Sequence, residues 1–291
     1  MPIISILTLM LTAATPDPDN PRQTIQHLAD SLHAEIGVAF HDLETGKSFN
    51  FNERLMLHAA STMKVPVMIE VFRQAEAGAF KLDDSLLVKN EFKSIVDGSL
   101  YSMDFGEDSD ETMYNKIGTR MTIRQLVEQM ITVSSNLATN LLIDLVNAKN
   151  VMATLHSLGI KNMQVLRGVE DGKAYERGLN NRTDAYDLML TLKSIVENKA
   201  ASPASCHEML EVLKRQRFRE NIPAGLPAGT IIANKTGHIT NIAHDAAIVF
   251  PAHRRPYILT VLTHKINEHR LAAQIIARIS KSIWQHFIET R

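Results

Sequence analysis

Ser61 and Lys64 are the pair of side chains in this sequence with the clearest potential for covalent chemistry. Apolar residues recur at helical spacing over residues 65–72, which predicts a helix with one buried face. Side chains three residues apart share a helix face, so Lys64 could take the proton of the Ser61 hydroxyl if burial or nearby charge lowered its pKa. A hydroxyl activated in this way is a nucleophile. A lone Ser-x-x-Lys match also fits a helix-capping serine followed by a surface lysine, so the other motifs decide its meaning.

Three further motifs follow in chain order. Ser134, Ser135 and Asn136 lie between two helical patterns, and Lys235, Thr236 and Gly237 end a strand pattern. Ser-x-x-Lys, Ser-x-Asn and Lys-Thr-Gly in this order form the motif set of enzymes in which a serine reacts with penicillins. Residues 176–180 read Glu-x-x-Leu-Asn and lie in an aperiodic segment between the second and third of these motifs.

The four motifs together resemble those of the class A serine β-lactamases, in which Glu-x-x-Leu-Asn belongs to the Ω-loop. The resemblance runs from about residue 27 to the C-terminus and points to the wider superfamily of penicillin-binding-protein-like serine hydrolases. It implies that Ser61 attacks the lactam carbonyl after Lys64, or Glu176 through a water, takes its proton. Ser134 would protonate the leaving nitrogen beside the positive charge of Lys235. The expected catalytic residues are Ser61, Lys64, Ser134, Glu176 and Lys235.

The resemblance also implies a substrate-binding set. The backbone N–H groups of Ser61 and His238 would form the oxyanion hole, and Glu176 and Asn180 would hold the deacylating water. An arginine that many class A enzymes carry on the strand after Lys-Thr-Gly is absent here, and Arg270 on the last helix could replace it. The expected substrate-binding residues are Asn136, Asn180, Thr236, Gly237, His238 and Arg270.

The sequence departs from the class A pattern at several points. Ser135 replaces the aspartate of Ser-Asp-Asn, which removes an acceptor that normally braces this turn. The stretch between Ser61 and Ser134 is longer than usual, and residues 98–118 are expected to form an irregular surface excursion with a solvated acidic cluster. The family closes its Ω-loop with an Arg–Asp pair, for which Arg167 and Asp184 are the available partners.

The periodicity of the chain predicts strands near both ends and helices between them. We expect an α/β fold of the α+β type, with a five-stranded antiparallel sheet flanked by terminal helices, an all-helical lobe, and the active site in the cleft between them. A single catalytic domain would span residues 15–291. Its α/β lobe would take about residues 21–58 and 216–291, and its helical lobe about residues 59–215.

Composition narrows the partners and the compartment. The 291 residues include 31 basic and 32 acidic ones, so no excess of positive charge suggests a nucleic-acid partner. Residues 1–14 are uncharged and apolar, which predicts a signal peptide and therefore a bacterial protein that is periplasmic or secreted. We expect the mature protein to be soluble and monomeric. The single cysteine, Cys206, allows no intramolecular disulfide, and no paired Cys/His spacing suggests a metal, so we expect no cofactor.

Two other functions share part of the motif set. A D-Ala-D-Ala peptidase or related esterase would use Ser-x-x-Lys, Ser-x-Asn and Lys-Thr-Gly but would not be expected to carry the Glu176–Asn180 motif. A penicillin-sensing domain would be acylated without turnover. Hydrolysis of a small-molecule β-lactam is the function that accounts for all four motifs.

Overall fold

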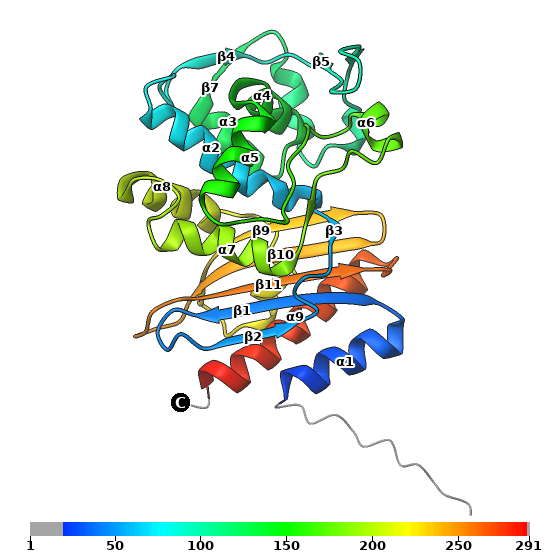
Figure 1. The fold of residues 1–291 in the computed structure, drawn as a ribbon, viewed down its shortest axis with the longest axis vertical. Helices are drawn as coiled ribbons and strands as arrows, with labels where there is room; N and C mark the ends of the chain where they lie inside the picture. The colour runs from blue at the N-terminus through cyan, green and yellow to red at the C-terminus, as the bar shows by residue number, and fades with distance from the viewer. Residues whose placement is uncertain (1–19, 290–291) are drawn as a thin grey trace, which may run out of the picture.

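A five-stranded antiparallel sheet brings together strands from both ends of the chain (Figure 1). The computed structural model describes residues 20–289, so the predicted signal peptide at residues 1–14 lies outside the described residues. The strand order is β2-β1-β11-β10-β9. The strands are β1 (Glu35–Asp42), β2 (Ser48–Phe51), β9 (Ile231–Ile239), β10 (Ile242–Phe250) and β11 (Tyr257–His264).

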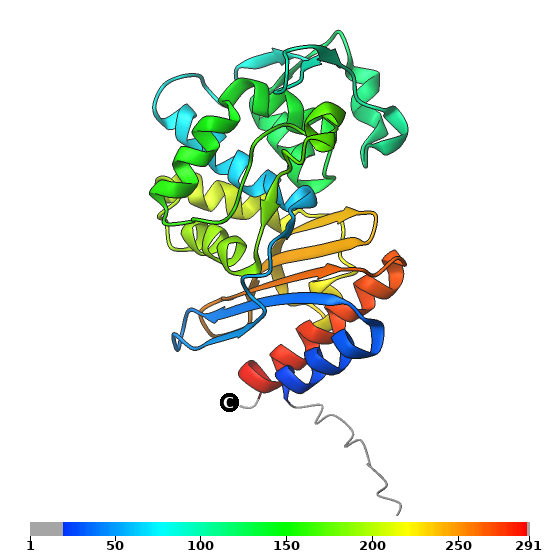
Figure 2. The same ribbon diagram turned by 45° about the vertical axis from the view of Figure 1, so that its right-hand side comes forward.

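Two helices cover the outer face of this sheet (Figure 2). They are α1 (Pro21–Leu32) and α9 (His269–Trp284), which continues into the π-helical turn η5 (Gln285–Glu289). Successive side chains of a strand point to opposite faces, so each strand supplies two cores. Val38 packs with Ile25 and Ile276 in the outer core, whereas the next residue, Ala39, belongs to the core of the helical lobe.

The inner face of the sheet carries the helical lobe. α2 runs through the centre of this lobe, and every residue of its first two turns is buried. The helices of the lobe are α2 (Lys64–Glu76), α3 (Ile123–Thr132), α4 (Asn136–Val146), α5 (Ala148–Ser157), α6 (Gly172–Glu176), α7 (Ala185–Val196) and α8 (Pro203–Lys214). The predicted fold class is confirmed.

Short elements connect these layers. β3 (Leu57–His58) pairs with β8 (Arg182–Thr183), β4 (Ser85–Leu87) with β7 (Arg120–Thr122), and β5 (Phe92–Lys93) with β6 (Leu100–Tyr101). The 3-10 helices are η1 (Ala60–Met63), η2 (Phe105–Glu107), η3 (Glu111–Lys116) and η4 (Ile222–Gly225). Across residues 20–289, no helix is both long enough and apolar enough to cross a lipid bilayer.

Residues 98–118 differ from the predicted solvated excursion. They contain β6, η2 and η3, and two of their acidic side chains, Asp108 and Asp110, are buried. Aperiodic sequence gives no sign of burial, so the prediction followed the polar composition of this stretch and was wrong for these two residues.

Candidate active site

A cleft of about 720 Å³ lies between the two lobes and collects residues from all three serine-enzyme motifs. Ser61 enters it from η1, which leads directly into the buried helix α2. Ala60, which precedes the serine, has φ of 45°, a left-handed conformation that costs free energy for a residue with a Cβ atom. The predicted site residues that line the cleft are Ser61, Ser134, Asn136, Thr236, Gly237 and His238.

Lys64 is wholly buried beneath this cleft and is held by the Ser-x-Asn turn. Its Nζ donates to the carbonyl of Ser134 at 2.7 Å, to Ser134 Oγ at 3.2 Å and to Asn136 Oδ1 at 2.8 Å. Burial lowers the pKa of Lys64 to about 7, against the opposing charges of Asp108 and Glu170. An amine with this pKa is substantially neutral at physiological pH and can act as a base.

We expect the rate of Ser61 acylation to rise with pH and to level off above about pH 7. Only the neutral amine of Lys64 can accept the serine proton, and its lowered pKa makes that form abundant above about 7. The rate of penicillin-adduct formation, followed by intact-mass spectrometry across the range from about pH 5 to 9, measures this. Lys64→Arg should be inactive throughout, because a guanidinium does not lose its proton. A rate that stays flat in the wild type would exclude Lys64 as the base.

The Ser134 hydroxyl accepts hydrogen bonds from two lysines, Lys64 and Lys235. Lys235 is wholly buried, and its Nζ donates to Ser134 Oγ and to the Thr236 carbonyl, each at 2.9 Å. Burial and the nearby Lys64 lower the pKa of Lys235, and Asp245 opposes this. The Ser134 hydroxyl is therefore connected to Lys64 and Lys235 and is placed to pass a proton between them and a substrate atom in the cleft.

β9 carries Lys235 and is an edge strand of the sheet, so one side of its backbone faces away from β10. Gly237 packs tightly against η1: a Cβ atom there would lie 3.1 Å from Ala60 Cβ and 3.2 Å from the Ser61 nitrogen. Such contacts are tighter than normal van der Waals packing, so a side chain at this position would push β9 away from the nucleophile. Glycine thus lets the backbone of β9 approach Ser61, as an oxyanion hole from both segments requires.

Glu170, a carboxylate outside the four motifs, reaches this group. Asn136 Nδ2 donates to Glu170 Oε1 at 2.9 Å, and the backbone N–H of Asp104 donates to Glu170 Oε2 at 3.0 Å. Asn136 therefore bridges Glu170 and Lys64. Glu170 lines the cleft and has φ of 60°, so its backbone is held in a conformation that favours glycine.

The segment that carries Glu170 is fixed by side chains of the helical lobe. Asn140 on α4 accepts from the Val169 N–H at 2.7 Å and donates to the Val169 carbonyl at 3.0 Å. Asp171 accepts from Ser94 Oγ and from the Ile95 N–H, both at 2.9 Å. These bonds hold the residues on either side of Glu170, which offsets the cost of its backbone conformation.

The structure does not bring Glu176 into the cleft. Glu176 ends the short helix α6, its side chain is exposed, and it is not among the lining residues. Asn180 is also absent from the lining: its Oδ1 accepts from Arg167 Nη2 at 2.9 Å and so closes the base of the loop. The two side chains predicted from the Glu-x-x-Leu-Asn match therefore lie outside the cleft, whereas Glu170, from the same loop, lines it.

Arg270 likewise lies outside the cleft, since it is exposed and does not line it. The preceding residue, His269, does line the cleft and packs its ring against that of His238, with 4.0 Å between the ring centroids. Burial and the charge of His269 lower the pKa of His238, and Glu220 opposes this. His269 and Arg270 are neighbours in the first turn of α9, so their side chains point in different directions from the helix. The prediction of Arg270 was wrong because the side chain that lines the cleft is that of His269.

A sequence model described as the β-lactamase enzyme family matches residues 20–287 of the chain. The chain belongs to this family. It is 24% identical over 298 residues to a β-lactamase of Bacteroides uniformis, with 97% of each chain covered. It is also 24% identical to a β-lactamase of Streptomyces albus G, over 81% of this chain and 74% of that one. Membership of this family implies a hydrolase.

Solved β-lactamase structures have the same fold. A β-lactamase from Sphaerobacter thermophilus superposes with a TM-score of 0.80 at 25% identity, over 92% of this chain and 97% of that one. An ancestral class A β-lactamase gives a TM-score of 0.80 at 23% identity, over 92% and 100%. PBP-A gives 0.79 at 24% identity, over 94% and 100%, and a mutant of PBP-A was solved as an acyl-enzyme complex with penicillin G. The predicted family and fold are therefore confirmed.

This β-lactamase-family chain closes its Ω-loop differently from the predicted Arg–Asp pair. Arg167 is buried and donates to the carbonyls of Leu179 and Gly168, each at 2.9 Å, in addition to its bond to Asn180. Asn181 accepts from the Arg167 N–H at 3.2 Å and donates to the Arg167 carbonyl at 3.0 Å. Asp184 caps α7 instead of pairing with Arg167, so two asparagines replace the expected acid.

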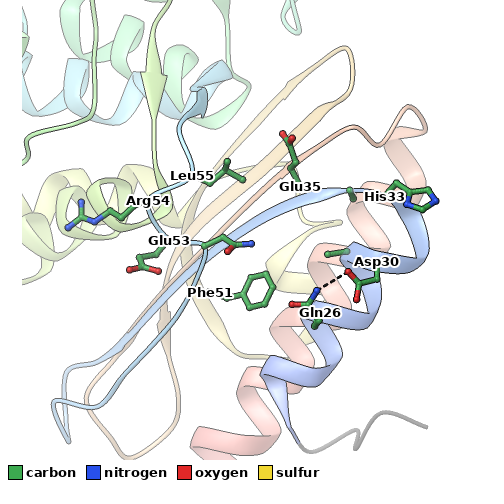
Figure 3. Close-up of a pocket in the computed structure, with 11 residues that line it drawn as sticks. Gln26, Asp30, His33, Glu35, Phe51, Glu53, Arg54 and Leu55 are labelled. Carbon is green, nitrogen blue, oxygen red and sulfur yellow. Dashed lines mark hydrogen bonds between the residues drawn. The ribbon is translucent and has the colours of Figure 1, made fainter. Parts of the chain in front are cut away.

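A second cavity, of about 640 Å³, lies between α1 and the adjoining ends of β1 and β2 (Figure 3). Several of its charged side chains already have partners: Gln26 Nε2 donates to Asp30 Oδ1 at 2.8 Å, and Arg54 pairs with Asp187 at 2.9 Å. None of the motif residues lines it. The interlobe cleft is therefore the site where the motifs can act together.

Proposed function

We propose that this protein is a serine β-lactamase that hydrolyses penicillins and cephalosporins through an acyl-enzyme on Ser61. Neutral Lys64 takes the hydroxyl proton as Ser61 Oγ attacks the lactam carbonyl. The N–H groups of Ser61 and His238 stabilise the oxyanion. When the C–N bond breaks, the nitrogen takes the proton of Ser134, which regains one from Lys64. The hydrogen bonds that join Lys64, Ser134 and Lys235 support this route.

Deacylation distinguishes a lactamase from a peptidase or a sensor. Glu170 takes a proton from a water, whose oxygen attacks the ester carbonyl. When the C–O bond to Ser61 breaks, this proton passes from Glu170 to Ser61 Oγ, which restores the ionised Glu170, the neutral Lys64 and the free serine. The observation that carries the proposal is the pair of bonds by which Asn136 joins Glu170 to Lys64, because they place a carboxylate beside the acylation machinery. We assign to Glu170 the role that the sequence analysis gave to Glu176.

Hydrolysis of a chromogenic cephalosporin by the purified protein tests this function. We expect sustained turnover with no accumulating adduct. A single stoichiometric burst, with a stable adduct on Ser61, would instead establish a penicillin-binding or sensing protein. Absence of both turnover and adduct would exclude reaction with β-lactams of this kind.

His269 is our proposed replacement for the absent carboxylate-binding arginine, together with the Thr236 hydroxyl. We expect His269→Ala to lower kcat/KM for a cephalosporin about tenfold, mainly through KM, because a hydrogen bond to a charged group is worth about 1.5–3 kcal/mol. Arg270→Ala is the matched control on the neighbouring position and should change kcat/KM less than about twofold. The opposite ranking of the two variants would restore Arg270 to the site.

We also propose that the enzyme acts in the periplasm or outside the cell after residues 1–14 are removed. The support is the uncharged apolar sequence of that segment, which is typical of a signal peptide. Intact mass of the exported protein tests this: a mature N-terminus near Thr15 is expected. A full-length cytosolic product would contradict it.

A further inference from the structure

We propose that Asp108 is a positioning residue of this site and supplies, from a distant segment, the carboxylate that Ser135 lacks. The inference rests on the proposed β-lactamase function and adds a residue to it. Asp108 lies in the stretch of residues 98–118, between η2 and η3, and its side chain is buried.

Three hydrogen bonds attach Asp108 to the Ser-x-Asn turn and to its own segment. Its Oδ1 accepts from the Asn136 N–H at 2.9 Å and from the Asp110 N–H at 3.0 Å, and its Oδ2 accepts from the Leu137 N–H at 2.9 Å. Asn136 and Leu137 are the first two residues of α4, whose N–H groups have no partner within the helix. A carboxylate is favoured there by hydrogen bonding and by the helix dipole.

Ser135 performs only part of the same task. Its Oγ accepts from the Ala138 N–H at 3.2 Å and so caps the third residue of α4. The carboxylate of Asp108 satisfies the first two N–H groups, and the hydroxyl of Ser135 satisfies the next. With Asp108 present, the first three N–H groups of α4 all have side-chain acceptors although the middle residue of the motif is a serine.

The bond from Asp108 reaches a residue that contacts the catalytic lysine. The side chain of Asn136 accepts from Lys64 Nζ at 2.8 Å and donates to Glu170 at 2.9 Å, while its backbone N–H is held by Asp108. The charge of Asp108, with that of Glu170, also opposes the effect of burial on the pKa of Lys64. Asp108 thus orients Asn136 and supplies negative charge beside Lys64 without touching the substrate.

Local structure holds Asp108 in place. Asp104 caps η2 by accepting from the Gly106 N–H at 2.9 Å, and Asp110 caps η3 by accepting from the Thr112 N–H at 3.1 Å. The rings of Phe105 and Tyr114 meet edge to face, with 5.4 Å between their centroids. Two capped turns braced by an aromatic pair therefore hold Asp108, which lies between them, against the start of α4.

Four variants test the proposal: Asp108→Ala, Ser135→Asp, the double variant Asp108→Ala/Ser135→Asp, and Asp110→Ala. The last is the matched control, since Asp110 is an equally buried acid that caps its own helix, and only its backbone N–H contacts Asp108. The rate of acylation by penicillin is measured across a range of pH by rapid quenching followed by intact-mass spectrometry. In substrate-free protein, the titration of Lys64 is followed by ¹³Cε-lysine NMR.

We expect Asp108→Ala to slow acylation about tenfold to a hundredfold. The acid limb of the pH–rate profile, where the rate rises as Lys64 loses its proton, should move to lower pH because Lys64 loses a stabilising negative charge. The groups whose charges bear on Lys64 are then Glu170 and Lys235. The double variant, which restores Ser-Asp-Asn, should recover most of the rate and the wild-type limb. Asp110→Ala should keep the wild-type limb.

Two results would overturn the proposal: an Asp108→Ala protein with the wild-type rate and pH profile, or a loss that Asp110→Ala reproduces in full. A folded double variant that recovers neither rate nor limb would also count against it, since a carboxylate at the turn would then not suffice. If the wild-type protein does not react with penicillin, the proposed function fails instead. The NMR titration of Lys64 then decides the role of Asp108 by itself.

Discussion

Glu170→Gln is expected to convert the protein from one that turns over penicillin into one that stays acylated. The substitution keeps the shape of the side chain and its bond to Asn136 but removes the basic oxygen that would activate water. A positioned general base contributes about 10²–10⁴-fold, so steady-state turnover should fall by that factor. Acylation should persist because Lys64 is the base for that step. Mass spectrometry after brief mixing should show a long-lived adduct in the variant and none in the wild type.

Glu176→Gln is the matched control for this experiment. Both acids lie in the same loop, but the Glu176 side chain is exposed at the end of α6 and does not line the cleft. Its turnover should equal that of the wild type. If Glu176→Gln accumulates the adduct and Glu170→Gln does not, the motif match gave the right base and the geometric assignment to Glu170 fails.

Ser61→Ala should abolish both covalent labelling by penicillin and turnover. Loss of a serine nucleophile removes the acyl-enzyme route altogether, and a reduction of at least about 10⁴-fold is expected. Intact-mass spectrometry measures the adduct, and a chromogenic cephalosporin measures the turnover.

Ser109→Ala provides the comparison for Ser61→Ala. Ser109 is another serine that lines the cleft. If penicillin labelled exposed hydroxyls without selectivity, Ser109→Ala would also reduce the labelling. We expect this variant to be labelled and to turn over as the wild type does. An adduct that survives in Ser61→Ala would assign the nucleophile to another residue.

The sequence predicted the residues whose chemistry depends on short-range spacing. Ser61 and Lys64 lie three residues apart, Ser61 in η1 and Lys64 at the start of α2, and the strand pattern before Lys235 placed Lys-Thr-Gly on the sheet. In the structure Ser134 bonds to both lysines and lines the cleft together with Ser61. The five-stranded sheet and the helical lobe were also predictable, because strand and helix periods differ along the chain.

Glu170 was missed because the loop that carries it has no period. The segment contains three acids, Glu170, Asp171 and Glu176, and a motif match selected the last of them. The local sequence gave only a weak indication of which acid is exposed. Glu176 follows a tyrosine and precedes an arginine on a short polar helix, whereas Glu170 follows Gly168 and Val169. Glu170 and Asp171 both line the cleft, and contacts between residues distant in sequence distinguish them. The Glu170 carboxylate bonds to Asn136, whereas that of Asp171 bonds to Ser94 and Ile95.

Asp108 and His269 could not be predicted for related reasons. The burial of Asp108 depends on a contact with α4 across a stretch that reads as polar loop, so composition alone assigned it to solvent. His269 and Arg270 are both plausible anion-binding residues, and their ranking depends on the rotation of α9 at its first turn. Motifs thus predicted the family, while the positions of these further residues depend on tertiary contacts.

The position of β1 inside the sheet, between β2 and β11, has a consequence for synthesis of the chain. β1 pairs with β2 on one side, but its other partner is β11, so that Val38 lies opposite Val261. On the ribosome the whole helical lobe emerges before that partner exists, and an isolated two-stranded hairpin is only marginally stable. Pairing across so long a separation is slow to form. Lys235 and Gly237 lie on β9, which also emerges late, so a nascent chain has Ser61 long before it has the groups that would make this serine reactive.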